Sequence, residues 1–316
     1  MPEVYVNRIT SALGEEARDV EETAACNKMV SSCDVIRQAG FARHHVCSEA
    51  TTAYDLARRA VAELGAEIDG TGAIVYSTCI PANANLGASD AFARSGDVKH
   101  LMDFPASHLQ ADFGLDGASV IGLTQQACTS LLGSIRVARA LLVSEPELRK
   151  VLCVTADRFP NGALYEQAYN LISDGAAACV VSEERRGFRV VAWHAITNGA
   201  LAQASDDETV GAYFSYIHKI IIETVAKAGL TLPEIAWIVP QNTNVSAWKI
   251  LARLLPFDPE RIFLGSIAEI GHIISSDNLV NLRLMDDAGL IHGGERLLLV
   301  MAGFGLNWQA LILEKM

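Results

Sequence analysis

The sequence predicts an α/β protein built from two similar halves, and two observations support this prediction. Short apolar segments alternate with helical patterns along the chain, which is typical of parallel sheets covered by helices. A plan of strand, polar turn and helix also occurs twice, first in Val120–Leu142 and again in Trp237–Leu255. Two such halves that face each other would bring both polar turns to one shared crevice.

Each element follows from a local pattern. Short apolar runs predict strands at Gly72–Thr78, Ser119–Leu123, Val151–Ala156 and Leu297–Ala302. Ala50–Leu64 has helical spacing of its apolar residues, and Gly211–Gly229 is a long amphipathic helix that ends at a glycine. The charged stretch Glu183–Arg186 is the predicted boundary. Residues 1–183 then form the half that carries a nucleophile, and residues 184–316 form the half that carries a histidine and an aspartate.

The composition limits the partners of the chain. It has 316 residues, of which half are apolar, and a net charge of -12. Such a negative excess disfavours nucleic acid and anionic membrane surfaces. The first residues show no basic start followed by an apolar run, and there is no stretch of about 18 apolar residues. We therefore expect a protein that binds neither nucleic acid nor a membrane.

The seven cysteines are spread along the chain, and none forms a Cys-x-x-Cys pair or a cluster with histidines. Zinc is therefore not expected, and we predict no metal site. An odd, scattered set is typical of a reduced cytoplasmic protein whose cysteines are mostly small core residues. We give this structural role to six of them, Cys26, Cys33, Cys47, Cys79, Cys153 and Cys179.

Cys128 differs from the other six in its position. It stands at the end of a predicted strand and one residue before a helix that runs to about Val143. A helix N-terminus offers free backbone N–H groups and the positive end of the helix dipole, and both favour a thiolate over a thiol. The position predicts that Cys128 is a nucleophile.

A second candidate group surrounds His272. A glycine precedes this histidine, and Asp277 lies five residues further on, where a helical pattern begins. A hydrogen bond from the imidazole to this carboxylate would fix the tautomer, as in a nucleophile–histidine–carboxylate triad. Alternatively, Asp277 serves the helix dipole and Ser276 is the N-cap. The spacing favours neither interpretation.

The segment Gly303-Phe304-Gly305 interrupts an apolar strand near the end of the chain. Glycines at such a place allow backbone N–H groups to approach a reacting carbonyl oxygen. A tight hairpin explains the same residues without a function. On the pattern alone we favour the hairpin.

Taken together, these segments resemble ketoacyl synthase III, the condensing enzyme that starts fatty-acid synthesis, and its relatives. The resemblance covers nearly the whole chain and is carried by Arg37–Arg43 (RQAGFAR), Pro105–Cys128, Ile172–Ala177 (ISDGAA) and Gly294–Trp308 (GERLLLVMAGFGLNW). It implies a thiolase fold, in which two similar α/β halves form a five-layered αβαβα arrangement. It also implies a homodimer and an acyl-thioester intermediate on Cys128.

Two departures from the family pattern decide the expected chemistry. The condensing enzymes have a histidine in a PHQAN segment and an asparagine in a GNT segment, and these two side chains stabilise an enolate. Here Gln241 replaces that histidine, in an active-site polar turn that also holds Asn244, and His272 replaces that asparagine. The set of Cys128, His272 and Asp277 resembles instead the Cys–His–Asp acyltransferases of natural-product pathways, such as polyketide and antibiotic biosynthesis.

The same resemblance implies how the substrate is held. The backbone N–H groups of Cys128 and of Phe304 or Gly305 would form the oxyanion hole. The tryptophan that stacks on coenzyme A in the family falls at Cys33, whereas the phosphate-contacting Arg37 is kept. We therefore expect an acyl carrier protein, or else a coenzyme A thioester, as the pantetheine-bound donor, and no further cofactor. An acidic carrier would need a local basic patch beside Arg37 and Arg43.

The predicted function is that of an acyltransferase. A carrier-protein or coenzyme A thioester acylates Cys128, and His272 activates the hydroxyl, amine or thiol of a small-molecule acceptor. Two alternatives stay open: a condensing synthase that uses a Cys–His pair, and a catalytically silent partner subunit of a related enzyme. Release of CO2 from a malonyl donor separates the first alternative from acyl transfer, and thiol labelling tests the second.

Overall fold

The structure is a computed structural model that describes residues 2–87, 89–304 and 306–316. The strands of the first half are β1 (Tyr5–Leu13), β2 (Glu16–Asp19), β3 (Arg43–Val46), β4 (Thr71–Ser77), β5 (Ser119–Leu123), β6 (Lys150–Asp157), β7 (Glu166–Gln167), β8 (Asn170–Leu171) and β9 (Gly175–Ser182). Its helices are α1 (Val20–Ala25), α2 (Cys33–Gln38), α3 (Ala53–Leu64), α4 (Ser89–Ser95), α5 (Pro105–Asp112) and α6 (Ser130–Ser144).

The second half repeats the alternation of strands and helices. Its strands are β10 (Phe188–Thr197), β11 (Trp237–Pro240), β12 (Arg296–Gly303) and β13 (Asn307–Lys315). Its helices are α7 (Asp206–Lys227), α8 (Val245–Leu254), α9 (Ile267–Ile270) and α10 (Asp277–Asp287). Short 3-10 turns connect these elements at Gly65–Ile68, Pro81–Ala84, Val98–Leu101, Ala127–Thr129, Gly199–Gln203, Leu232–Glu234, Pro259–Arg261 and Ile274–Ser276.

Within the described residues, nine strands form one continuous mixed sheet in the order β11-β12-β13-β10-β1-β9-β6-β4-β5. β1 joins the two halves, because it pairs with β9 from Tyr5 to Leu13 but with β10 only at Tyr5 and Val6. The sheet therefore divides into β5-β4-β6-β9-β1 and β10-β13-β12-β11. In the first part β4 runs parallel to both β5 and β6, so the carboxyl ends of these three strands meet at one edge.

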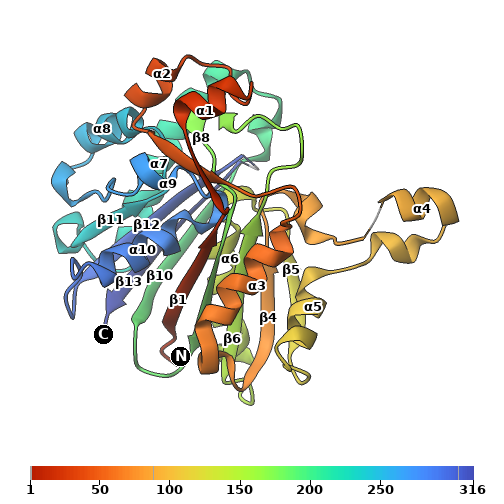
Figure 1. Cartoon of the computed structure of the whole chain (residues 1–316). Helices are drawn as coiled ribbons and strands as arrows, with labels where there is room; N and C mark the ends of the chain where they lie inside the picture. Colours follow the sequence, from red (N-terminus) through yellow and green to blue (C-terminus); the bar gives the residue numbers. More distant parts are fainter. Residues whose placement is uncertain (1, 88, 305) are drawn as a thin grey trace.

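The helices complete five layers (Figure 1). α6 and α10 pack between the inner faces of the two half-sheets, with side chains such as Ile135 and Leu282 fully buried. α3 and α5 cover the outer face of the first half-sheet, and α7 and α8 cover that of the second. This arrangement confirms the predicted fold. By length and composition alone Ala127–Ser144 is apolar enough to cross a membrane, but its place in the central layer, where 61% of it is buried, explains that character.

The predicted segments lie at or near their predicted places. The repeated plan of strand, turn and helix is realised twice, by β5 with α6 and by β11 with α8. α3 begins three residues later than predicted, behind the capping box of Thr52, and α7 begins at Asp206 because Ser205 and Glu208 form another capping box. The charged stretch proposed as the boundary lies in the turn between β9 and β10.

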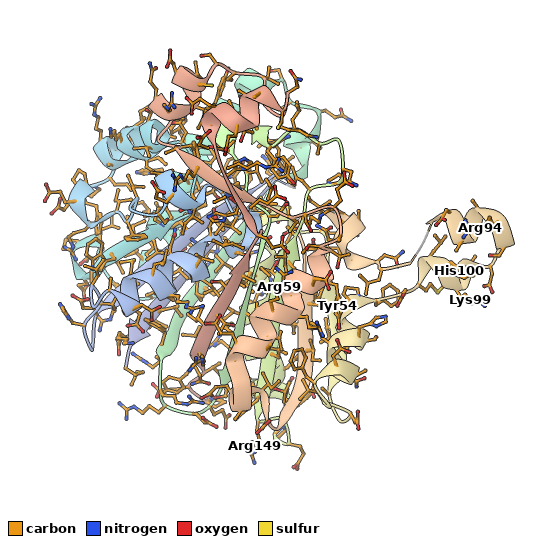
Figure 2. The ribbon with its side chains drawn as sticks, viewed as in Figure 1. Tyr54, Arg59, Arg94, Lys99, His100 and Arg149 are labelled. Atoms are coloured by element: carbon orange, nitrogen blue, oxygen red, sulfur yellow. The ribbon has the colours of Figure 1, made fainter. Side chains whose placement is uncertain are left out.

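One edge of the sheet is open to solvent. β5 lies at this edge, and its apolar residues are only partly covered; Val120 is 41% exposed. Beside it an arm that carries α4 and the 3-10 turn Val98–Leu101 projects from the body (Figure 1). Figure 2 shows Arg94, Lys99 and His100 on this arm, far from the packed layers. The arm also exposes large apolar side chains, namely Val98, Leu101, Met102 and Phe104.

Candidate active site

Cys128 lies in a tight turn between a strand and the central helix. The 3-10 turn Ala127–Thr129 leads directly into α6, which begins at Ser130, two residues after Cys128 rather than one. Ala127 has a φ of 46°, a left-handed conformation that residues with a side chain rarely adopt. The thiol is thereby held at the amino end of a 15-residue helix, and Cys128 is 6% exposed.

His272 of the second half is fixed through its backbone to the first half. The His272 N–H donates to Leu171 O at 2.8 Å, and the Ser173 N–H donates to His272 O at 2.8 Å. Gly271 permits this approach, because its φ is 71° and a Cβ atom there would lie 2.9 Å from Leu171 O. Glycine is therefore needed before His272 for steric reasons, and the close approach of the two backbones places the histidine against the half that holds the nucleophile.

Asp277 is fully buried, and its carboxylate accepts three hydrogen bonds. Nδ1 of His272 donates to Oδ2, the Asn242 N–H donates to the same oxygen at 2.7 Å, and the Ile273 N–H donates to Oδ1 at 2.6 Å. In the described part of the chain, Ser276 makes no side-chain capping hydrogen bond. The contacts match the triad interpretation of Asp277 and not the capping interpretation. They fix Nδ1 as a protonated nitrogen, so Nε2 is the one that exchanges a proton.

The charges of the three groups support one another. The hydrogen bond with the Cys79 thiol has the largest effect on the pKa of Cys128 and lowers it well below its ordinary value; His272 lowers it further, although burial opposes both. Burial alone would lower the pKa of His272, but the charge of Asp277 and its hydrogen bond outweigh burial and raise that pKa to about 10. Both shifts favour a thiolate beside an imidazolium at neutral pH.

The turn after β12 approaches the nucleophile closely. A Cβ atom on Gly303 would lie 3.1 Å from Cys128 N and 3.0 Å from Gln126 O, so only glycine fits without displacement. β12 and β13 form the hairpin that the pattern favoured. The side chain of Phe304 is 68% exposed, and Gly305 lies outside the described residues. The oxyanion role of these backbone N–H groups stays a prediction.

The polar turn after β11 contacts the triad through one residue. The Asn242 N–H binds Asp277, whereas the buried Gln241 turns to β12, where its amide oxygen accepts the Ala302 N–H at 2.6 Å. Asn244 is the N-cap of α8, and its side-chain oxygen accepts a backbone N–H two residues further on at 2.8 Å. Gln241 and Asn244, both predicted at the active site, therefore make contacts that stabilise the turn itself.

The predicted donor-side cations are balanced by acids of the same chain. Arg37, in the last turn of α2, forms an ion pair with Glu21, and half of its side chain is exposed. Arg43 lies 3.8 Å from Glu269. A phosphate group that binds Arg37 would have to compete with Glu21.

Two residues near Cys128 were not singled out by the sequence. Sγ of Cys79 lies 3.6 Å from Sγ of Cys128, so Cys79 borders the nucleophile and is not simply a core residue as we expected. Asp157 is fully buried, and burial outweighs its hydrogen bonds and raises its pKa to about 6. Cys79 follows β4 and Asp157 ends β6. Their positions at the carboxyl ends of parallel strands are the signal that could have found them.

Comparison with known proteins gives consistent matches over both halves. The model of the 3-oxoacyl-acyl-carrier-protein synthase III family matches residues 124–199, and the model of its C-terminal part matches residues 225–315. A beta-ketoacyl-acyl-carrier-protein synthase III from Chlamydia caviae is 26% identical over 288 residues, which cover 82% of this chain and 80% of that protein.

Solved structures show the same fold. A synthase III from Thermus thermophilus superposes with a TM-score of 0.83 at 22% identity and covers 99% of both chains. ChlB3, described as an acyltransferase, also superposes with a TM-score of 0.83, at 17% identity, and covers 100% of this chain and 98% of its own. At these identities the likeness establishes the arrangement of the chain and leaves the reaction to the residues of the site.

Proposed function

Because this chain belongs to the ketoacyl-synthase-III-like family of thiolase-fold enzymes, we propose that it is an acyltransferase that works through a Cys128 thioester. The acyl group comes from a pantetheine-bound donor and goes to the hydroxyl, amine or thiol of a small acceptor. One observation supports this proposal most directly: Asp277 binds Nδ1 of His272. A histidine held in this way is oriented as a proton acceptor.

In the first half-reaction, the Cys128 thiolate attacks the carbonyl carbon of the donor thioester. The carbon–sulfur bond to pantetheine breaks, and the imidazolium of His272 gives its proton to the departing thiolate. The result is an acyl thioester on Cys128 beside a neutral imidazole.

In the second half-reaction, neutral His272 takes the proton of the acceptor as the acceptor attacks the acyl carbon. The bond to sulfur breaks, and the Cys128 thiolate leaves beside a new imidazolium. The raised pKa of His272 favours this proton transfer, and Asp277 keeps Nδ1 protonated so that Nε2 receives the proton. The site thus returns to its starting charges.

A condensing synthase is the second candidate, because the relative from Chlamydia caviae carries that name. A condensing cycle must stabilise the enolate that forms when a malonyl thioester loses CO2. The residue at the corresponding position, Gln241, is a neutral amide that is held by other contacts: its oxygen accepts the Ala302 N–H, and its side chain also hydrogen-bonds Tyr213. In the acylated enzyme His272 is neutral and its one proton, on Nδ1, is bound to Asp277, so Nε2 has no hydrogen to donate to an enolate. These contacts favour acyl transfer.

An acyl carrier protein is the donor that we favour. The Val245 N–H donates to Ala39 O at 2.8 Å, so α8 lies beside α2, which carries Arg37. Two exposed cations of α8 make no ion pair with another described residue, and they alternate with exposed apolar side chains: Lys249, Ile250, Arg253 and Leu254. Such a mixed basic and apolar face suits an acidic carrier protein.

A homodimer is the proposed assembly. β5 has an apolar sequence and an unpaired outer edge, and the neighbouring arm exposes Val98, Met102 and Phe104. Unpaired apolar edges promote association, and a second copy would cover this edge and these side chains together. The assembly would bring each arm against the other subunit.

The setting of the reaction is also a proposal. All seven cysteines, each within the described residues, are free thiols, as expected in the reducing cytoplasm. A place in the biosynthesis of a polyketide or antibiotic rests on the resemblance of Cys128, His272 and Asp277 to the acyltransferase branch of the family.

The experiment that tests the proposed function offers the pure protein acyl thioesters of coenzyme A and of a carrier protein. Mass spectrometry should find the acyl group on Cys128, and an added alcohol or amine should remove it as an ester or amide. His272→Ala should slow this transfer about 10²–10⁴-fold, the usual effect of losing a general base. The exposed His292, changed to alanine, is the matched control and should leave the rate unchanged.

A malonyl thioester labelled in its free carboxyl group separates the two candidates. Acyl transfer predicts no labelled CO2 above the background of a Cys128→Ala variant, because Gln241 and His272 do not replace the pair that stabilises the enolate in the condensing enzymes. Labelled CO2 released in step with product would establish the condensing synthase instead.

A further inference from the structure

The nucleophile has a second thiol in contact with it. Sγ of Cys79 lies 3.6 Å from Sγ of Cys128, about the contact distance of two sulfur atoms. A disulfide bond measures about 2.05 Å, so each sulfur would need to move by less than about 1 Å. Cys79 comes from the turn after β4 and Cys128 from the turn before α6, so two separate segments meet here.

A buried carboxylate holds both segments in place. Asp157 accepts the Cys79 N–H at 2.9 Å and the Ile80 N–H at 2.9 Å, and it also accepts the Thr78 hydroxyl. The Ser275 hydroxyl lies 3.3 Å from Asp157 Oδ2 and 3.3 Å from the carbonyl oxygen of Ala127, the residue before Cys128. One carboxylate therefore sets the position of the Cys79 turn directly and braces the Cys128 turn through a serine.

We propose that Cys79 and Cys128 form a modification site, at which a hydroperoxide such as hydrogen peroxide converts the two thiols into a reversible disulfide. The contact of the two sulfur atoms and the common anchor of their turns support this proposal. Oxidation blocks Cys128 without destroying it, because Cys79 captures the first oxidation product before more oxygen is added.

The reaction balances in two steps. The Cys128 thiolate attacks one peroxide oxygen, which forms a sulfenic acid and releases hydroxide, and the imidazolium of His272 protonates the hydroxide to water. The Cys79 sulfur then attacks the sulfenic sulfur, and its proton leaves with the hydroxyl group as a second water. The two thiols lose two electrons in total, and the peroxide accepts them. A dithiol reductant reverses the modification by thiol–disulfide exchange.

The charges at the site favour this order of events. Cys128 reacts first because its lowered pKa makes it the thiolate, whereas the hydrogen bond with Cys128 and burial raise the pKa of Cys79 and keep it a thiol. Cys79 is half-buried and Cys128 is 6% exposed, and a site that admits an acyl thioester also admits the smaller peroxide. Acylated Cys128 has no thiolate and is protected from peroxide.

The same chain contains an internal control. Cys153 and Cys179 lie directly opposite each other on β6 and β9. Both side chains are fully buried in the sheet, and burial raises the pKa of Cys153. This pair has proximity but neither access nor a thiolate, so peroxide should leave it reduced.

The test treats the full-length protein with hydrogen peroxide and then maps its peptides by mass spectrometry without reduction. We expect the intact protein to lose the mass of two hydrogen atoms and the peptides of Cys79 and Cys128 to be joined, with Cys153 and Cys179 still free. Acyl loading from a thioester donor should be lost and should return after treatment with dithiothreitol. Prior acylation should prevent the cross-link.

A Cys79→Ser variant sharpens the test, with each sample compared with its own untreated protein. Without the second thiol, peroxide should carry Cys128 to the sulfinic acid, and dithiothreitol should not restore loading. Joined peptides from any other pair, or oxygen added to wild-type Cys128 while Cys79 stays alkylatable, would overturn the proposal. If the Cys79→Ser variant does not fold, the peptide map of the peroxide-treated wild-type protein is sufficient to test the proposal. The disulfide is measured independently of acyl transfer; only the loading readout rests on the proposed function, so the two can fail separately.

Discussion

Asp277→Asn tests whether the carboxylate charge organises the site. The change keeps the size of the side chain but removes the charge that raises the pKa of His272 to about 10. Burial then lowers the pKa of His272, because only the Cys128 thiolate is left to balance an enclosed imidazolium. The imidazole becomes neutral at neutral pH, and the Cys128 thiolate loses its counter-ion. Both the reactivity of Cys128 and the transfer step should fall.

The size of each effect follows from the contacts. A thiol with the ordinary pKa of about 8.5 is about 3% thiolate at neutral pH, so alkylation of Cys128 would slow about 30-fold if its pKa returned to that value. In the variant burial still raises this pKa and the hydrogen bond with Cys79 still lowers it, so the loss should be on the order of 30-fold. Acyl transfer also loses the orientation of His272 and should slow about 10²–10⁴-fold. Acylation of Cys128 should still occur.

Folding stability must be measured beside the rates. An asparagine at 277 offers one acceptor oxygen to the N–H groups of Asn242 and Ile273, which now bind separate oxygens at 2.7 and 2.6 Å. One buried N–H then faces an amide NH2 group, at a cost on the order of 1–3 kcal/mol in the free energy of unfolding. Denaturant unfolding gives this value, and it should leave a folded protein for kinetics.

Asp174→Asn is the matched control. Asp174 is also fully buried, and its carboxylate accepts the Cys47 and Phe159 N–H groups at 2.8 Å each, but it does not contact His272 through its side chain. We expect a similar loss of stability with normal alkylation of Cys128. If Asp277→Asn alkylates and transfers at the wild-type rate, the reasoning about the triad is wrong. If both variants lose alkylation equally, the effect comes from packing.

Three further predictions follow from single features of the structure. The rate of Cys128 alkylation by iodoacetamide should already have reached its plateau below neutral pH, and a plateau reached only above pH 8 would contradict the thiolate. Cys47, whose pKa burial raises to about 12, should stay unlabelled in peptide maps. Gly271→Ala should lower the melting temperature and slow acyl transfer, because the new Cβ atom would displace the segment that carries His272. Gly65→Ala is the control: its φ is also positive, at 59°, but no described atom lies within 4 Å of the new Cβ atom, so only the melting temperature should fall. Val120→Lys should convert a dimer into a monomer in sedimentation velocity, and a wild-type monomer would refute the proposed assembly.

Local pattern was enough to predict most of the fold. Apolar runs and helical spacing located β4, β5, β6, α3 and α7 within a few residues, because each is long and regular. The errors lie at helix starts, where side-chain capping decides the first residue. Ser205 caps α7, which begins at Asp206, five residues before the predicted Gly211. The five layers and the dimer came from the family resemblance, since no pattern of spacing shows how two halves pack.

Within the site, the sequence could identify those residues whose role is indicated by their neighbours along the chain. Cys128 precedes a helix, and Asp277 follows His272 at a fixed interval, so both could be proposed from neighbouring residues. The choice between a triad and a helix cap needed coordinates, because it depends on where the Asp277 carboxylate points. In the polar turn after β11, neighbouring residues were not enough to choose the contact. Asn244 was predicted from its segment and caps α8 in the structure, whereas the contact with the triad is made by Asn242.

Cys79 and Asp157 show what a single sequence lacks. Each follows or ends a strand with no distinctive neighbours, and the two are far apart along the chain. Their meeting with Cys128 depends on the strand order β6-β4-β5, which places three carboxyl ends side by side. Once that order is known, a polar or nucleophilic residue just after any of these strands becomes a candidate for the site. The turn after β4 then places a thiol beside Cys128, and β6 supplies the carboxylate that holds this turn.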